Sequence, residues 1–151
     1  MAQYKAAYPA DLKIHPEVDA FFIRFYGISD TPGLTNEDQM VSLHSAVETA
    51  HSEDPTTNGA PEREEITTLR EGMWSTVASR KHTIHKIFPF GNDATEVMIY
   101  GSVELGLRSG STVYSEWAAR AQLTKDEADG EWKMSFYQVY MDTGPMIAQK
   151  K

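Results

Sequence analysis

The sequence predicts an α+β fold, in which three N-terminal helices pack on one face of a curved antiparallel sheet of four to six strands. Apolar residues recur at helical spacing in the first half of the chain. From residue 81 onward they alternate with polar residues, as in half-buried strands. Short turn sequences separate the alternating segments, which is typical of a meander, in which each strand pairs with the next.

The first predicted helix begins at Pro16 and ends at Gly27. Proline suits the first turn of a helix because it has no N–H group to satisfy there. Five apolar side chains follow at the spacing that places them on one face: Val18, Phe21, Phe22, Phe25 and Tyr26. The stretch "SDTPG" then turns the chain.

Two more helices are predicted before the sheet. The second starts at Thr35, which together with Asp38 resembles a capping box. The third starts at Pro61 and carries an apolar stripe of Ile66, Leu69, Met73 and Val77. Arg80 and Lys81 are placed at its C-terminal end, where positive charge is favoured.

Four strands are predicted over about 81–89, 96–107, 111–123 and 131–142. The segments "GNDAT", "RSG" and "KDEADG" connect them. These strands are long, so the sheet must twist and bend, and Gly101, Gly106, Ala118 and Ala119 permit bending.

Alternation also predicts which side chains face the helices. The inner sets on the second and third strands are Val97, Ile99, Gly101, Val103 and Leu105, and Val113, Trp117, Ala119, Ala121 and Leu123. On the last strand Met134 and Phe136 are predicted inside, whereas Val139 and Met141 have the opposite parity. Either a bulge near Tyr137–Gln138 or burial of both faces would explain this change.

The outer face of the sheet carries aromatic and charged residues, namely Tyr100, Glu104, Tyr114, Glu116, Arg120 and, with Phe136 inside, Tyr137. A solvated face with cross-strand charge pairs is one interpretation. The other is a homodimer interface, where tyrosine and arginine are favoured.

Two of the five histidines, His82 and His85, are three residues apart. On a helix both rings would share one face and suggest a metal site. The segment alternates as a strand, so the two rings should point to opposite faces of the sheet. We therefore predict no metal site and no cofactor.

Composition bounds the possible partners. The chain has 151 residues, a formal net charge of −8 and no cysteine. Its length predicts one domain over 1–151, with short tails at 1–13 and 144–151. The negative charge argues against nucleic acid, and no apolar run is long enough to cross a membrane. The start of the chain lacks the apolar core of a signal peptide, so we expect a cytoplasmic protein.

The motifs "FYGISDTP", "LREGMWSTVASRKHTIHKIFPFG", "YGSVEL", "EWAARAQL" and "FYQVYMDT" resemble the fungal SnoaL-like proteins of the nuclear-transport-factor-2-like superfamily. The resemblance covers roughly residues 15–143. It implies a cone-shaped fold with an apolar cavity between helices and sheet. The superfamily contains polyketide cyclases, isomerases and dehydratases as well as non-catalytic binding or dimerisation modules, so the fold does not decide the function.

His82 is the first catalytic candidate, because a histidine in an apolar pocket can move protons near neutral pH. Its place in "RKH" is similar to that of a catalytic histidine of scytalone dehydratase. That enzyme's second histidine would fall near Gly101 and is missing here. A structural histidine bonded to backbone or to a helix end is the alternative.

Tyr26 and Asp30 are the other catalytic candidates, because related enzymes present a tyrosine or an aspartate to the cavity at the end of the first helix. A core role for Tyr26 and a turn-capping role for Asp30 remain open. The oxyanion-hole acid of ketosteroid isomerase would fall near Ala119 and is absent. The residues predicted to line a substrate site are Phe22, Met73, Trp74, Ile99, Gly101, Trp117, Ala119, Met134, Phe136 and Tyr140.

The resemblance and these residues lead to two hypotheses. The first is a cofactor-free isomerase or lyase, of the cyclase or dehydratase type, that acts on a small apolar molecule of the polyketide or terpenoid kind in secondary metabolism. His82 would transfer protons, and Tyr26 or Tyr140 would hydrogen-bond a substrate oxygen. The alternative is a non-catalytic ligand-binding or dimerisation module of the same fold.

Overall fold

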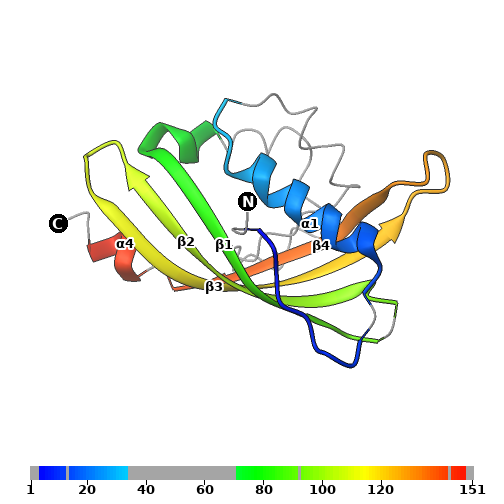
Figure 1. Ribbon diagram of the computed structural model, residues 1–151. Coiled ribbons are helices and arrows are strands. Elements are labelled where there is room, and N and C mark those ends of the chain that lie inside the picture. Colours follow the sequence, from blue (N-terminus) through cyan, green and yellow to red (C-terminus); the bar gives the residue numbers. More distant parts are fainter. Residues whose placement is uncertain (1–3, 13, 34–70, 92, 143, 149–151) are drawn as a thin grey trace, which may run out of the picture.

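The computed structural model describes residues 4–12, 14–33, 71–91, 93–142 and 144–148. Within these ranges the chain forms one four-stranded antiparallel sheet in the order β1-β2-β3-β4, which confirms the predicted meander (Figure 1). The second predicted helix and most of the third lie outside the described residues. The described elements are α1 (Pro16–Ser29), β1 (Val77–Pro89), β2 (Glu96–Leu107), β3 (Thr112–Lys125), β4 (Trp132–Met141) and α4 (Gly144–Ala148).

Helix α1 lies along one face of the curved sheet (Figure 1). As predicted, proline occupies its first turn, and its buried side chains are Val18, Phe21, Phe22 and Tyr26. It continues two residues past the predicted end at Gly27, and Asp30 caps it by donating its backbone N–H to the carbonyl of Tyr26. This extra half turn brings the Asp30 side chain toward the sheet.

The third predicted helix ends earlier than the sequence pattern indicated. Residues 71–76 are helical, and β1 begins at Val77, where the pattern predicted a helix as far as Arg80. Val77 pairs with Leu107 and Arg80 with Leu105 of β2. Spacing alone does not distinguish helix from strand here, because Met73 and Val77 also fit a helical stripe. The pairing of Val77 with β2 determines that the backbone is extended from this residue onward. Arg80 is therefore a strand residue.

The inner faces of β2 and β3 are as predicted. Their inward side chains form one core with α1, and the outward Tyr100, Glu104, Tyr114 and Glu116 are exposed. No helix in the described part of the chain is long and apolar enough to cross a membrane.

Strand β4 corrects the predicted parity. The register shifts between Gln122 and Leu123 of β3, so that Met134 pairs with Leu123 and Phe136 with Gln122. Ser135 is therefore the bulged residue, two positions before the predicted bulge. Phe136 consequently lies on the outer face, where the Arg120 guanidinium lies 5.0 Å from its ring centroid. Tyr137, predicted outside, pairs with buried Ala121 and faces α1.

An N-terminal strap, residues 4–12, runs beside the edge of β1 opposite to β2 (Figure 1). Ala7 donates its N–H to the carbonyl of His85 at 3.1 Å and accepts from the N–H of Ile87 at 3.0 Å. Part of the predicted tail therefore pairs with backbone groups at this edge of the sheet.

Candidate active site

His82 and Asp30 form the centre of the candidate site. Strand β1 carries the histidine, and the C-terminal cap of α1 supplies the carboxylate. The His82 backbone N–H donates to Asp30 Oδ2 at 2.7 Å, and His82 Nδ1 lies 2.5 Å from Asp30 Oδ1. The His82 and Asp30 side chains are 14% and 6% exposed, so the pair is mostly shielded from water.

This geometry selects one tautomer of the neutral imidazole. A carboxylate can only accept a hydrogen bond, so Nδ1 of His82 carries the proton. The lone pair is then on Nε2, which makes no hydrogen bond within the described part of the chain. A buried carboxylate that orients a histidine in this way leaves Nε2 as a proton acceptor.

Arg80 places a positive charge next to the pair. Its Nε lies 3.4 Å from Asp30 Oδ1, and its NH2 group donates to both oxygens of Ser29, the last residue of α1. The guanidinium also lies 5.2 Å from the Trp74 ring centroid, and its NH1 contacts the sulfur of Met73. One carboxylate therefore compensates a buried guanidinium and orients an imidazole at the same time.

Tyr26 lies beside the imidazole, and Tyr137 lies behind Tyr26. The rings of Tyr26 and His82 are 5.3 Å apart, and the hydroxyls of Tyr26 and Tyr137 are 3.2 Å apart. One hydroxyl must donate to the other, which leaves the second O–H hydrogen without a partner among the described residues.

Trp117 packs against His82 edge to face at 5.5 Å, and its buried Nε1–H also has no hydrogen-bond partner in the described ranges. Buried donors without partners are unusual in native proteins, so these groups are suited to bind a ligand oxygen.

The electrostatics of the site favour a neutral imidazole. Burial lowers the pKa of His82, although Asp30 opposes this effect. Burial raises the pKa of Asp30, but the hydrogen bonds and charge of His82 outweigh it, so that the net pKa is below its usual value. Burial also raises the pKa of Tyr26 well above its usual value and that of Tyr137 to about 12, so both hydroxyls stay protonated at neutral pH.

The structure brings the three predicted catalytic residues, His82, Tyr26 and Asp30, into one cluster. The same contacts also tie the end of α1 to β1, so a structural role for the pair remains compatible with them. As predicted, His85 points to the other face, where its Nε2 lies 3.1 Å from the hydroxyl of Ser102. In the described ranges, no three metal-ligating side chains are grouped to hold an ion.

The residues predicted to line a substrate site divide into three groups. Phe22, Ile99, Ala119 and Met134 are fully buried in the core between α1 and the sheet. Gly101 and Trp117 lie beside His82, and Met73 and Trp74 surround Arg80. Phe136 and Tyr140 do not face the interior between α1 and the sheet. Both lie on the outer face. The bulge at Ser135 shifts Phe136 outward, and Tyr140 pairs with Ala118 and is half exposed.

Sequence reasoning missed three polar groups of the site. The helical spacing predicts Arg80 at a helix end, and strict alternation with Phe136 inside predicts Tyr137 on the outer face. Tyr4, whose hydroxyl donates to Asp30 Oδ2 at 3.0 Å, lies in a segment interpreted as a tail. The parity of β1 could have identified Arg80, because it lies two residues before His82 and therefore faces the same side of the sheet. No local pattern indicates Tyr4, because its contact spans 26 residues.

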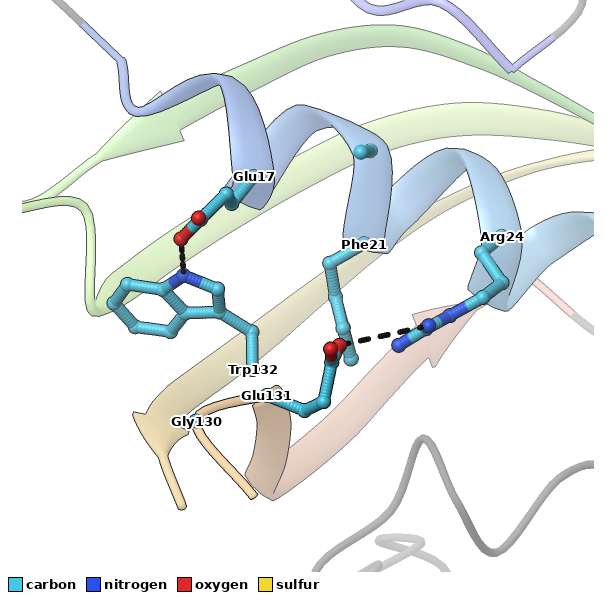
Figure 2. A pocket seen from close by; sticks show the side chains of 7 residues that line it. Glu17, Phe21, Arg24, Gly130, Glu131 and Trp132 are labelled. Atoms are coloured by element: carbon cyan, nitrogen blue, oxygen red, sulfur yellow. Dashed lines mark hydrogen bonds and ion pairs between the residues drawn. The ribbon is translucent and has the colours of Figure 1, made fainter. Parts of the chain in front are cut away.

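A pocket of ≈ 250 Å³ lies away from this cluster, between α1 and the turn that joins β3 to β4. Figure 2 shows that Glu17 accepts a hydrogen bond from the Trp132 indole and that Arg24 faces Glu131. His82 does not line this pocket. The apolar cavity between helices and sheet that the resemblance implies stays a prediction.

Gly101 lets Trp117 approach the backbone beside His82. A Cβ atom at Gly101 would lie 2.6 Å from the carbonyl oxygen of Thr83 and 2.7 Å from Cζ2 of Trp117. No larger residue fits without moving the indole. This explains in packing terms why a second histidine has no room at this position.

Replacing Gly101 with alanine is therefore expected to destabilise the protein by about 1–3 kcal/mol through overpacking. Urea unfolding monitored by tryptophan fluorescence measures the loss. Gly72→Ala is the matched control, since a Cβ atom at this helical residue would meet nothing within 4 Å, so that this change should be neutral or slightly stabilising. Equal stability of the two variants would contradict the packing argument.

No protein-family model and no curated protein matches the sequence. Solved structures do share its fold. AclR, a candidate hydroxylase from Streptomyces galilaeus, is 11% identical with a TM-score of 0.65, over 89% of this chain and 95% of that one. A candidate polyketide cyclase from Bacillus cereus is 15% identical with a TM-score of 0.64, over 93% and 90% of the two chains.

A nuclear-transport-factor-2-like protein from Burkholderia pseudomallei is 12% identical with a TM-score of 0.61, over 88% of this chain and 93% of that one. At such identities the likeness establishes the fold and leaves the activity open. The chain therefore has the nuclear-transport-factor-2-like fold, an α+β architecture with a curved antiparallel sheet.

Proposed function

We propose that this protein is a SnoaL-like enzyme that performs cofactor-free acid–base chemistry on a small apolar molecule. The supporting observation is Nε2 of His82, which has no hydrogen-bond partner among the described residues, while the other ring nitrogen lies 2.5 Å from the buried carboxylate of Asp30. A structural histidine needs only the Nδ1 contact. A base also needs an unengaged lone pair that is largely shielded from water, and within the described part of the chain Nε2 meets this requirement.

The chemistry follows from the groups around Nε2. His82 would take a proton from a carbon next to a carbonyl group, and the negative charge would move to the carbonyl oxygen. The second O–H of the Tyr26–Tyr137 pair and the Nε1–H of Trp117 have no partner among the described residues, and they could donate to that oxygen. Return of the proton to another carbon gives isomerisation, attack of the carbanion gives cyclisation, and loss of a β-hydroxyl as water gives dehydration.

Two similarities support a polyketide-like substrate. The candidate polyketide cyclase of Bacillus cereus shares the fold over most of both chains. The sequence motifs resemble the fungal SnoaL-like proteins, which suggests a role in secondary metabolism. We further propose that the protein acts in the cytoplasm, because the cysteine-free composition suits a reducing compartment.

The base can be tested without the natural substrate. In 5-nitrobenzisoxazole a base removes the C3 proton, the N–O bond breaks, and 2-cyano-4-nitrophenolate forms with a yellow colour. The wild-type protein is expected to accelerate this elimination with saturation kinetics. A rate that only follows the background reaction of free imidazole would contradict the proposal and favour the non-catalytic binding module.

We also propose that the outer face of the sheet binds a second copy of the chain. Tyr100 pairs with Ala118, which pairs with Tyr140, so two exposed tyrosines flank a small residue across three strands. Phe88 and Met98 form the adjacent row. A two-fold axis perpendicular to β3 at Ala118 would set Arg120 over Glu116 of the partner subunit, so this face is complementary to itself.

Met98→Glu is expected to convert the dimer to a monomer in light scattering, because it would bury a charge in this interface. Ile23→Glu is the control, since Ile23 on α1 is as exposed as Met98, at 38% against 41%. That variant should keep the wild-type mass. A wild-type protein that is monomeric at high micromolar concentration would overturn the proposal.

A further inference from the structure

The N-terminal strap is attached to β1 close to the candidate site. Its Ala7 bonds with His85 and Ile87, just past His82 on the same strand. Two tyrosines of the strap reach α1 from this anchor. Tyr4 donates to Asp30 Oδ2 at 3.0 Å, and Tyr8 donates to Asp19 Oδ1 at 2.9 Å. Only the first of these carboxylates contacts His82.

The hydrogen bonds of Asp30 show what Tyr4 adds. Oδ1 faces Nδ1 of His82 and Nε of Arg80, and Oδ2 accepts from the backbone N–H of His82 and from Tyr4. His82 supplies two of these contacts as hydrogen bonds and Arg80 supplies an ion pair, and both residues belong to β1. Tyr4 is the one donor from another segment in the described part of the chain, and it approaches Oδ2 on the side of the strap.

Tyr4 remains a donor throughout the working range of pH. Burial and the charge of Asp30 raise the pKa of Tyr4 to about 12, so its hydroxyl stays protonated. The other titratable or charged groups that face His82 from the described elements are Asp30 and Tyr26 on α1 and Arg80 on β1, with Tyr137 on β4 behind Tyr26.

We propose that Tyr4 is a positioning residue, through which the N-terminal strap holds the Asp30 carboxylate against Nδ1 of His82 and sets how strongly the imidazole binds a proton. A hydrogen bond from a neutral hydroxyl to Oδ2 lowers the negative charge density on the carboxylate, so Asp30 stabilises the imidazolium less. It also restricts rotation of the side chain at the end of α1. The effect of Tyr4 on catalysis rests on the proposed function, whereas its effect on the proton affinity of His82 does not.

Tyr4→Phe tests this inference, with Tyr8→Phe as the matched control. Each variant removes one tyrosine hydroxyl from the same strap, and each should lose a similar, small amount of thermal stability. In an NMR titration of histidine-labelled protein, Tyr4→Phe is expected to move the midpoint of His82 to higher pH, because Asp30 then stabilises the imidazolium more. Tyr8→Phe should leave that midpoint unchanged.

Difluorotyrosine at position 4 gives a second measurement in which the ring and the hydroxyl are kept. Its hydroxyl is a stronger donor, so the midpoint of His82 should move in the opposite direction. With 5-nitrobenzisoxazole, Tyr4→Phe should lower kcat/KM on the order of tenfold and move the acid limb of the pH profile together with the midpoint of His82. Tyr8→Phe should retain the wild-type profile.

The two proposals fail in different ways. A shifted His82 titration in a protein that does not turn over the probe would overturn the proposed function and retain the role of Tyr4. Full probe turnover with the same His82 midpoint in wild type, Tyr4→Phe and Tyr8→Phe would overturn the role of Tyr4 alone.

Discussion

Replacing His82 with asparagine is expected to lower kcat/KM for the elimination of 5-nitrobenzisoxazole by about 10²–10⁴-fold, the usual contribution of a general base. Asparagine can place an amide N–H near the position of Nδ1, so that Asp30 keeps a hydrogen-bond donor. The lone pair of Nε2 is lost. The melting temperature should therefore stay close to that of the wild type while the rate falls to the background.

His85→Asn is the matched control for this experiment. His85 lies on the same strand, three residues further along, and it contacts Ser102 and Tyr100 on the opposite face of the sheet. Its replacement should leave probe turnover unchanged. A fall in both variants would indicate damage to β1. Loss of folding in His82→Asn, or a folded variant that retains the wild-type rate, would favour the structural role of the histidine.

Alternation of side chains predicted the sheet and its inner face well. The predicted range of β2, 96–107, agrees with the observed strand Glu96–Leu107, and the inner residues of β2 and β3 follow from parity alone. This succeeds because a half-buried strand separates apolar from polar side chains at every second residue. The same rule placed His82 inside and His85 outside, although the register of β1 shifts between Ile84 and Lys86.

The errors share one physical cause, which is contact between segments far apart in the sequence. Ser135 is bulged because β4 must pair with β3, and no residue type in "MSFYQ" marks this position. Arg80 lies on a strand because it pairs with Leu105. Tyr4 and Asp30 meet only once the strap runs along β1. Local patterns report the preference of a segment, whereas these features depend on its partners.

Arg80 also changes the interpretation of Asp30. As a turn cap at the end of a helix, the carboxylate would be replaceable by asparagine at little cost, because either side chain can cap a turn. Next to a guanidinium that is only 12% exposed, the negative charge itself becomes necessary. The alternatives that the sequence left open for Asp30 therefore differ in a measurable quantity, the stability of the neutral variant.

Asp30→Asn is expected to lower the free energy of unfolding by about 3–5 kcal/mol at pH 7, because it leaves the buried Arg80 without its counter-charge. Urea unfolding measures this loss. Asp19→Asn is the control, since Asp19 on α1 accepts only the hydrogen bond of Tyr8 and should cost about 0.5–1.5 kcal/mol. Similar losses in the two variants would show that Asp30 acts only as a cap.

The pH dependence gives the same prediction an independent check. The net pKa of Asp30 is lowered in the folded protein, so its stabilisation is fully present above the unfolded value of about 3.9 and is lost as the pH falls through the folded value. The gap in stability between wild type and Asp30→Asn should therefore be constant near neutral pH and shrink below about pH 4. The lowered pKa of His82 affects stability at a higher pH than the lowered pKa of Asp30 does. The folded state favours the neutral imidazole, so wild-type stability should begin to fall below about pH 6.5. A stability gap that keeps its full size in strong acid would mean that the charge of Asp30 is not what holds Arg80 and His82 in place.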